Sequence, residues 1–228
     1  MGIHEPFESV FILRSLNNTD LFIDVGANVG HYSLIASGVK RCKSIAIEPI
    51  PDTFAKLQRN LELNNLKNLV ESKNLAVGKE KGKLYFSKDK GTMNKVVTDE
   101  YKKKLAIEVE KLDNILSDFK DYNQVFLKID VEGYELHVFK GAKNVLRNPK
   151  VNVIICEING SGNLYGVKDL EVYNELVSYG FKPFKYNLKY NAIEEIPQWN
   201  ESQYNTIFIR DIASITDRLK SSNYLFST

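Results

Sequence analysis

The chain of 228 residues carries 31 basic and 29 acidic side chains, so its net charge of +2 lacks the strongly positive balance of a typical nucleic-acid binder. Its hydrophobic content of 43% is enough for one large core and favours a single domain over two small ones. Only two cysteines occur, and no apolar run is long enough to span a membrane. We therefore expect a soluble cytoplasmic protein without a disulfide framework.

Apolar runs alternate with helical periodicities in the first third of the chain. The predicted strands cover residues 21–25, 44–49 and a stretch within 68–78, and the predicted helices cover residues 31–37 and 51–65. This alternation predicts a parallel, doubly wound α/β sheet with helices on both faces.

The middle of the chain interrupts that alternation. Residues 82–91 are expected to form a strand that ends in a loop, and residues 104–119 a strand that leads into a short helix, with a lysine-rich loop between them. The alternation then resumes, with predicted strands at 124–131 and 150–158 and predicted helices at 135–148 and 168–180. The last two predicted strands, 181–187 and 204–211, have no helix between them, which predicts an antiparallel hairpin at the sheet edge.

The turn after the first strand reads DVGANVG and resembles a nucleotide cradle. A dinucleotide motif would place glycines at three positions, but Asn28 and His31 stand where its second and third glycines belong, and the Gly-Lys-Ser/Thr ending of a Walker loop is absent. Gly26 and Gly30 are expected to let the backbone approach a ligand closely, and asparagine tolerates a left-handed conformation.

Asp24 narrows the choice of ligand. A carboxylate at the end of the strand would repel a pyrophosphate and attract an ammonium group, which favours S-adenosylmethionine as the cofactor. The alternative is an ordinary strand-to-helix turn in which Asp24 caps the helix.

A second carboxylate, Glu48, ends the next predicted strand, where an acidic side chain can accept both ribose hydroxyls. Leu75 and Ala76, at the end of the third strand, are expected near the adenine ring, with Asn74 as a polar neighbour. Taken alone, Glu48 could equally be an exposed residue at the end of a strand.

The segment FLKIDVEGYE carries the candidate catalytic residues. Lys128 and Asp130 lie two residues apart on a strand and therefore share one face, and Asp130 lies at the carboxyl end, with Glu132 just beyond it. We interpret Asp130 as the first candidate for a base or for positioning an acceptor. The next candidates are Lys128, Glu132 and His31. The alternative is a Lys-Asp ion pair followed by exposed glutamates that cap the next helix.

A divalent metal ion is a further hypothesis. Asp130, Glu157 and Asn159 lie at the ends of adjacent predicted strands and could converge as oxygen ligands that polarise a hydroxyl group. Acidic and amide groups are common at strand ends, however, and no spacing here is diagnostic of a metal site.

Several blocks of the sequence, in order, resemble the FkbM family of S-adenosylmethionine-dependent methyltransferases. They are FIDVGANVGHYSL, AIEPIPDTFAKLQRNLELNN, NLAVGKEKGKLYFS, VEKLDNIL, FLKIDVEGYELHVFKGA and ICEING. The resemblance implies a class I methyltransferase (Rossmann-like) fold with a seven-stranded sheet. It also implies methyl transfer to a hydroxyl oxygen, often on a sugar, a glycan or a natural product.

Carried onto this sequence, the resemblance places the methionine part of the cofactor at Asp24, Gly26, Asn28 and Gly30. It places the ribose at Glu48 and the inner edge of the active site at Asp130.

The expected methyltransferase domain spans residues 21–211, between an N-terminal extension (1–20) and a C-terminal tail (212–228). Two alternatives stay open: an RNA ribose methyltransferase and a cofactor-binding protein without catalysis. The first would use a lysine track for phosphates, comprising Lys95, Lys102, Lys103, Lys104 and Lys111.

Overall fold

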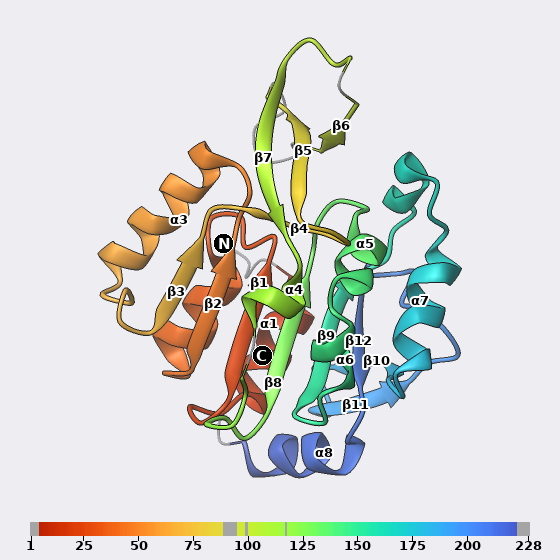
Figure 1. Cartoon of the computed structure of the whole chain (residues 1–228). Coiled ribbons are helices and arrows are strands. Elements are labelled where there is room, and N and C mark those ends of the chain that lie inside the picture. The colour runs from red at the N-terminus through yellow and green to blue at the C-terminus, as the bar shows by residue number, and fades with distance from the viewer. Residues whose placement is uncertain (1–4, 89–94, 99, 117, 223–228) are drawn as a thin grey trace.

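The computed structural model describes residues 5–88, 95–98, 100–116 and 118–222. Its main sheet contains the strands β1 (Leu21–Val25), β2 (Lys43–Ile47), β3 (Val70–Lys73), β8 (Val125–Ile129), β9 (Val151–Glu157), β10 (Lys182–Asn187), β11 (Ala192–Glu195) and β12 (Asn205–Ile209). These eight strands lie in the order β11-β10-β12-β9-β8-β1-β2-β3. The five strands from β9 to β3 run parallel, and β12 runs antiparallel to both β9 and β10 (Figure 1).

The mostly parallel α/β sheet is confirmed, but its count and its edge differ from the prediction. The last two predicted strands do pair antiparallel, yet β12 lies inside the sheet and the edge is β11, an eighth strand. The turn before β11 is formed by Asn187, whose side-chain oxygen accepts hydrogen bonds from the backbone amides of Lys189 and Tyr190 at 3.1 and 3.2 Å. Such side-chain turns depend on local hydrogen bonding and carry little periodic signal.

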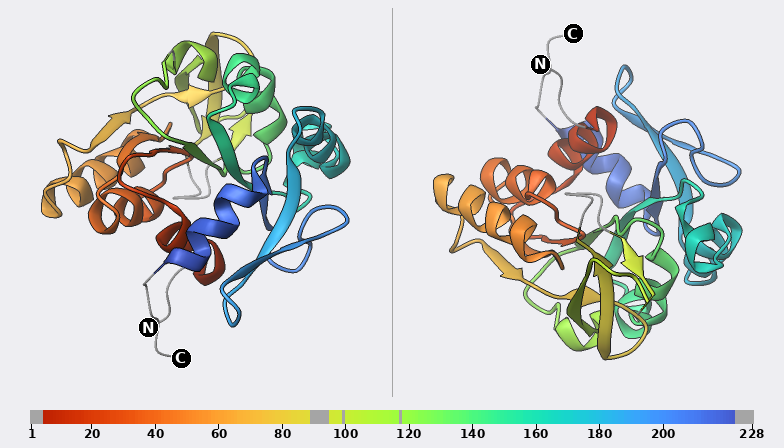
Figure 2. Two further views of the ribbon diagram at one scale, coloured as in Figure 1. Left: turned by 90° about the horizontal axis from the view of Figure 1, so that it is seen from below. Right: turned by 90° about the horizontal axis from the view of Figure 1, so that it is seen from above.

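Helices cover both faces of the main sheet. They are α1 (Pro6–Ser15), α2 (His31–Ser33), the π-helix η1 (Leu34–Val39), α3 (Pro51–Leu63), α4 (Leu112–Ile115), α5 (Glu135–Lys140), α6 (Lys143–Arg147), the 3-10 helix η3 (Ser161–Tyr165), α7 (Asp169–Ser178) and α8 (Ile212–Ser221). Helices α4 to α7 pack on one face, and α1, α2, η1, α3 and α8 pack on the other (Figure 2).

The helix predicted over 135–148 is divided into α5 and α6. The break lies at Gly141, where a Cβ atom would stand 2.0 Å from the carbonyl oxygen of Gly78. The chain needs a residue without a side chain at this contact, and the helix ends there.

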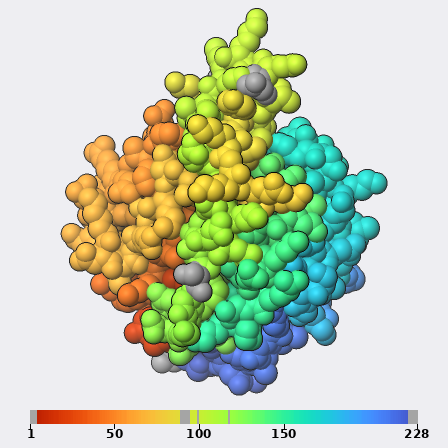
Figure 3. Space-filling view, in the orientation of Figure 1, coloured from red at the N-terminus to blue at the C-terminus, as the bar shows by residue number. Residues whose placement is uncertain are grey.

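A second sheet rises above the carboxyl ends of the main strands. It contains β4 (Ala76–Val77), β5 (Gly82–Ser87), β6 (Val96–Val97) and β7 (Lys104–Glu110), in the order β4-β7-β5-β6. Strands β5 and β7 form an antiparallel hairpin, which we call the arm, and it projects from the body of the molecule (Figures 1 and 3). Part of the lysine-rich loop predicted between these strands lies outside the described residues.

Helices from both ends of the chain pack side by side on the sheet (Figure 2). Arg218 of α8 donates hydrogen bonds to the carbonyl oxygen of Ser15 at 3.0 Å and to the buried carboxylate of Asp20 at 3.1 Å. These helices lie in the segments expected as extension and tail, and the division of the chain into those parts stays a prediction. None of the described helices has the length and apolar character needed to cross a membrane.

Helix α1 buries the carboxyl group of Glu8, which gives the fold a testable pH dependence. Burial raises the pKa of Glu8 from 4.5 to about 7. Between these two pH values the folded chain keeps a proton that the unfolded chain has released, so the free energy of unfolding falls as the pH rises and then levels off. We expect Glu8→Gln to stabilise the protein at pH 8 by about 1–3 kcal/mol, and the gain should shrink toward pH 5.

Urea unfolding at several pH values measures this difference. The matched control is Glu62→Gln on α3, where the carboxylate is 66% exposed and its replacement should leave the curve unchanged. Equal pH dependence in the wild type and in Glu8→Gln would contradict the burial argument.

Candidate functional site

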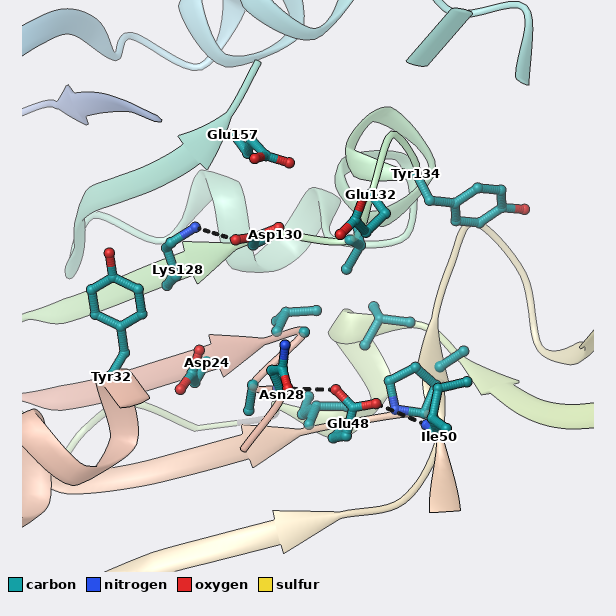
Figure 4. A pocket seen from close by; sticks show the side chains of 18 of the residues that line it. Asp24, Asn28, Tyr32, Glu48, Ile50, Lys128, Asp130, Glu132, Tyr134 and Glu157 are labelled. Carbon is teal, nitrogen blue, oxygen red and sulfur yellow. Dashed lines mark hydrogen bonds and ion pairs between the residues drawn. The ribbon is translucent and has the colours of Figure 1, made fainter. Parts of the chain in front are cut away.

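A cavity of about 280 Å³ lies at the carboxyl ends of β1, β2, β8 and β9, beneath the arm (Figure 4). Ten of the twelve residues that we predicted for the cofactor or for catalysis line this cavity: Asp24, Gly26, Asn28, His31, Glu48, Leu75, Ala76, Lys128, Asp130 and Glu132. The other two, Gly30 and Asn74, are not among its lining residues. Strand ends that are far apart in the sequence therefore meet as the pattern predicted.

The turn after β1 is left-handed at three positions, with φ angles of 82° at Gly26, 50° at Asn28 and 94° at Gly30. A Cβ atom on Gly26 would lie 1.8 Å from the backbone oxygen of Asp130, and one on Gly30 would lie 2.6 Å from Leu57. Gly26 is thus required by a backbone contact within the chain, and Gly30 is favoured by its left-handed φ angle. Gly26 also lines the cavity, whereas Gly30 supports the turn from outside it.

The side chain of Asp24 is only 1% exposed and holds the start of α2. One of its oxygens accepts hydrogen bonds from the backbone amide and the hydroxyl of Ser33, at 3.1 and 2.7 Å. Burial raises the pKa of Asp24 to about 6, although these hydrogen bonds and Lys128 favour the carboxylate. Asp24 therefore caps the following helix, as the alternative interpretation predicted, and it also lines the cavity.

Each oxygen of the Glu48 carboxylate accepts one backbone hydrogen bond, from Asn28 at 3.0 Å and from Ile50 at 2.9 Å (Figure 4). Since each carboxylate oxygen has two lone pairs, both oxygens keep capacity for a ligand. Burial raises the pKa of Glu48 to about 7. The Asn74 amide donates to the carbonyl oxygens of Glu48 and Pro49, so it fixes the backbone behind the site.

Apolar side chains form the wall of the cavity near Glu48. They are Ile50, Leu75, Ala76, Val77, Phe86 and Val96. The sequence pattern identified Leu75 and Ala76 but missed Phe86 and Val96, because these two lie on β5 and β6, outside the alternation of parallel strands and helices that located the other strand ends.

Lys128 has its ammonium group inside the protein, with 1% of the side chain exposed. It donates hydrogen bonds to Asp130 at 3.0 Å and to the side-chain oxygen of Asn205 at 3.1 Å. Burial opposes the charge, but Asp130 and Glu5 outweigh it and raise the pKa of Lys128. The predicted Lys-Asp pair is present; its lysine is buried, whereas the Asp130 side chain is 30% exposed.

Three further residues complete this arrangement, and sequence reasoning missed all of them. The Asn205 amide donates to Glu5 at 2.9 Å, and the Tyr32 hydroxyl donates to the other oxygen of Glu5. The bond between Glu5 and Asn205 joins residues 200 positions apart, so no local pattern could reveal it. His31, which the sequence did indicate as a candidate, lines the cavity and forms a 2.9 Å hydrogen bond with Ser9.

The glutamates after β8 have separate environments. Glu132 has a φ of 55° and forms an ion pair with Lys95 of the second sheet, at 3.7 Å. Glu135 is buried and accepts hydrogen bonds from the amides of Val131 and Gly133, both at 3.1 Å. Only Glu132 faces the cavity.

The three residues of the metal hypothesis do not all meet. Asp130 and Glu157 line the cavity, but Asn159 is exposed and its side-chain oxygen accepts a hydrogen bond from Ser161 at 2.9 Å. Within the described ranges of the chain, no three His, Cys, Asp or Glu residues are grouped so that they could hold a metal ion.

Comparison with known proteins adds a family and several relatives. The model of the methyltransferase FkbM domain matches residues 24–183. The hexuronic acid methyltransferase AglP of Haloferax volcanii is 28% identical over 148 residues, which cover 65% of this chain and 59% of AglP. Methyltransferase 1 of Beauveria bassiana is 25% identical over 171 residues, which cover 65% of this chain and 68% of that protein.

Solved structures show more distant likeness. An S-adenosylmethionine-dependent O-methyltransferase from Thermotoga maritima matches with a TM-score of 0.48 and 15% identity, over 91% of this chain and 66% of that one. An RNA methyltransferase from Salinibacter ruber, in complex with S-adenosylhomocysteine, matches with a TM-score of 0.39 and 14% identity, over 69% and 77% of the two chains.

The contact between Gly26 and Asp130 predicts a large effect of a single methyl group. Gly26→Ala would force a side chain into a left-handed residue and against a backbone oxygen. We expect the free energy of unfolding to fall by about 3 kcal/mol or more, measured by urea denaturation. Gly82→Ala is the control, since a Cβ atom at Gly82 would meet no atom within 4 Å. Equal stability of the two variants would show that the turn does not need the glycine.

Proposed function

Because the chain belongs to the methyltransferase FkbM domain family, we propose that it transfers a methyl group from S-adenosylmethionine to a hydroxyl oxygen of a sugar or sugar-containing acceptor. The observation that carries this proposal is the two-ended cavity. One end combines the Glu48 carboxylate with an apolar wall, and the other gathers Lys128, Asp130, Glu132 and Glu157.

The first end fits a nucleoside. A ribose has two neighbouring hydroxyls, and Glu48 has free acceptor capacity on both oxygens. Leu75 and Ala76 offer an apolar surface for an adenine ring, with Asn74 behind them. We assign the turn of Asp24, Gly26 and Asn28 to the amino-acid part, with Gly30 supporting it.

The other end fits a positive charge. When bound, S-adenosylmethionine supplies a methyl group on a positively charged sulfur. The carboxylates of Asp130, Glu132 and Glu157 line that end, and negative groups in a partly buried site stabilise a nearby cation. Lys128 is already bonded to Asp130 and Asn205, so we assign it to holding Asp130 in place.

A sugar acceptor is supported by one relative and by the carboxylates at the Asp130 end of the cavity. The name of the AglP relative specifies a hexuronic acid, which is a sugar derivative. The carboxylates near Asp130 can accept hydrogen bonds from several hydroxyls of one sugar ring. The matched region spans 59% of AglP, and the acceptor of this chain is proposed on both grounds together.

Methyl transfer to defined acceptors tests the proposal. The purified protein, tritiated S-adenosylmethionine and p-nitrophenyl β-D-glucoside, p-nitrophenyl β-D-glucuronide or unmodified RNA are incubated separately, with and without a chelator. We expect label in a glycoside. Label in RNA alone would overturn the sugar assignment in favour of ribose methylation, and dependence on added magnesium would restore the metal hypothesis.

Binding of S-adenosylmethionine should depend on Glu48. Glu48→Gln turns a side-chain NH2 group toward a backbone amide of Asn28 or Ile50, which removes one acceptor. We expect calorimetry to show affinity weakened by about 1–3 kcal/mol. The control is Glu71→Gln on β3, whose carboxylate is 62% exposed and lies outside the cavity lining. Unchanged affinity in Glu48→Gln would remove Glu48 from the ribose site.

A further inference from the structure

Glu157 lies at the end of β9, between two strands that also carry polar groups. Its neighbour Cys156 is paired with Ile129 of β8, and Glu157 itself is paired with Asn205 of β12. One step along the register places Glu157 beside Asp130, on the face of the sheet that also carries Lys128. Figure 4 shows the Glu157 carboxylate next to Asp130, at the reacting end of the cavity.

Glu157 differs from the other acidic residues that line the cavity. Glu5 accepts from Tyr32 and Asn205, Asp24 accepts from Ser33, and Glu48 accepts from two backbone amides. Asp130 and Glu132 are paired with Lys128 and Lys95. In contrast, the carboxylate of Glu157 has no hydrogen-bond donor or ion-pair partner among the described residues.

Lys128, whose charge acts on Glu157, forms no ion pair with it. Lys128 directs its ammonium hydrogens to Asp130 and Asn205. Burial and the negative charge of Asp130 raise the pKa of Glu157, so it binds a proton more readily than an exposed glutamate does. The carboxylate of Asp130, in contrast, already accepts a hydrogen bond from the ammonium group of Lys128.

We propose that Glu157 accepts the proton of the acceptor hydroxyl during methyl transfer, an inference that rests on the proposed function. The O–H bond of the acceptor breaks and its proton moves to the carboxylate of Glu157. The acceptor oxygen forms the new bond to the methyl carbon, while the carbon–sulfur bond breaks and its electron pair stays on sulfur, which loses its positive charge. Asp130 then orients the acceptor, and Lys128 is a positioning residue.

The protonation of Glu157 can be measured with no acceptor present. Infrared difference spectra of the wild type and Glu157→Gln, recorded across the neutral pH range, should isolate a protonated carboxyl band that disappears as the pH rises. Burial also raises the pKa of Glu8 and Glu48, but both residues are present in the two proteins, so their carboxyl bands cancel in the difference spectrum. Absence of a band belonging to Glu157 would overturn the inference.

Turnover gives the second readout, with p-nitrophenyl β-D-glucoside and p-nitrophenyl β-D-glucuronide as acceptors. We expect kcat of Glu157→Gln to fall by about 10²–10⁴-fold, because a general base contributes on that scale. Wild-type kcat should rise with pH as Glu157 loses its proton, and added formate should restore part of the activity of Glu157→Ala. Formate can replace a missing proton acceptor but cannot repair misfolding.

The control is Glu195→Gln, which changes an exposed residue on the edge strand β11 and should leave kcat unchanged. Calorimetry separates the two possible failures. If the wild type does not bind S-adenosylmethionine, the proposed function fails. If binding is intact but Glu157→Gln turns over as fast as the wild type, the function stands and the role of Glu157 is overturned.

Discussion

The ammonium group of Lys128 lies inside the sheet, where an uncompensated charge would cost several kcal/mol. Its compensation comes from three parts of the chain: Asp130 two residues away on the loop after β8, Asn205 on β12, and Glu5 behind Asn205. Glu5 accepts from the nitrogen of the Asn205 amide, which leaves the amide oxygen to accept from Lys128. The orientation of Asp130 at the cavity therefore depends on residues at both ends of the chain.

This arrangement ties the site to the stability of the fold. Helix α1 begins at Pro6, directly after Glu5. It packs on the face of the sheet that also carries Lys128. Removing one member of a buried ionic cluster leaves its partners unsatisfied, so site and fold respond together. Asp24 shows the same double role, because its carboxylate binds Ser33 and lines the cavity.

Much of the fold and of the candidate site could be predicted from the sequence. Alternation of strands and helices gave the parallel sheet, and the two-residue spacing of Lys128 and Asp130 placed both on one face. The rule that carboxyl ends of parallel strands meet at one edge correctly predicted that Asp24, Glu48 and Asp130 line one cavity. These predictions succeeded because periodicity within each segment identified the strands, and the carboxyl ends of parallel strands lie at one edge of a sheet.

The features that escaped prediction depend on contacts between distant segments. Glu5 and Asn205 meet across 200 positions. The need for Gly26 comes from the backbone of Asp130, and the division of α5 from α6 comes from Gly78. Strand β11 and the wall residues Phe86 and Val96 belong to hairpins that the chain adds around the parallel core.

Strand β5 of the arm and its neighbour β6 contribute to the cavity without being part of the main sheet. Among the described strands, β5 and β6 pair only within the second sheet, and yet Phe86 and Val96 reach the cavity. Substitutions in β5 or β6 can therefore reshape one wall of the cavity while the strand pairing of the main sheet stays in place. Because this wall lies beside Glu48, such changes would act on the end of the cavity that we assign to the nucleoside, while the carboxylates at the ends of the main strands keep their positions.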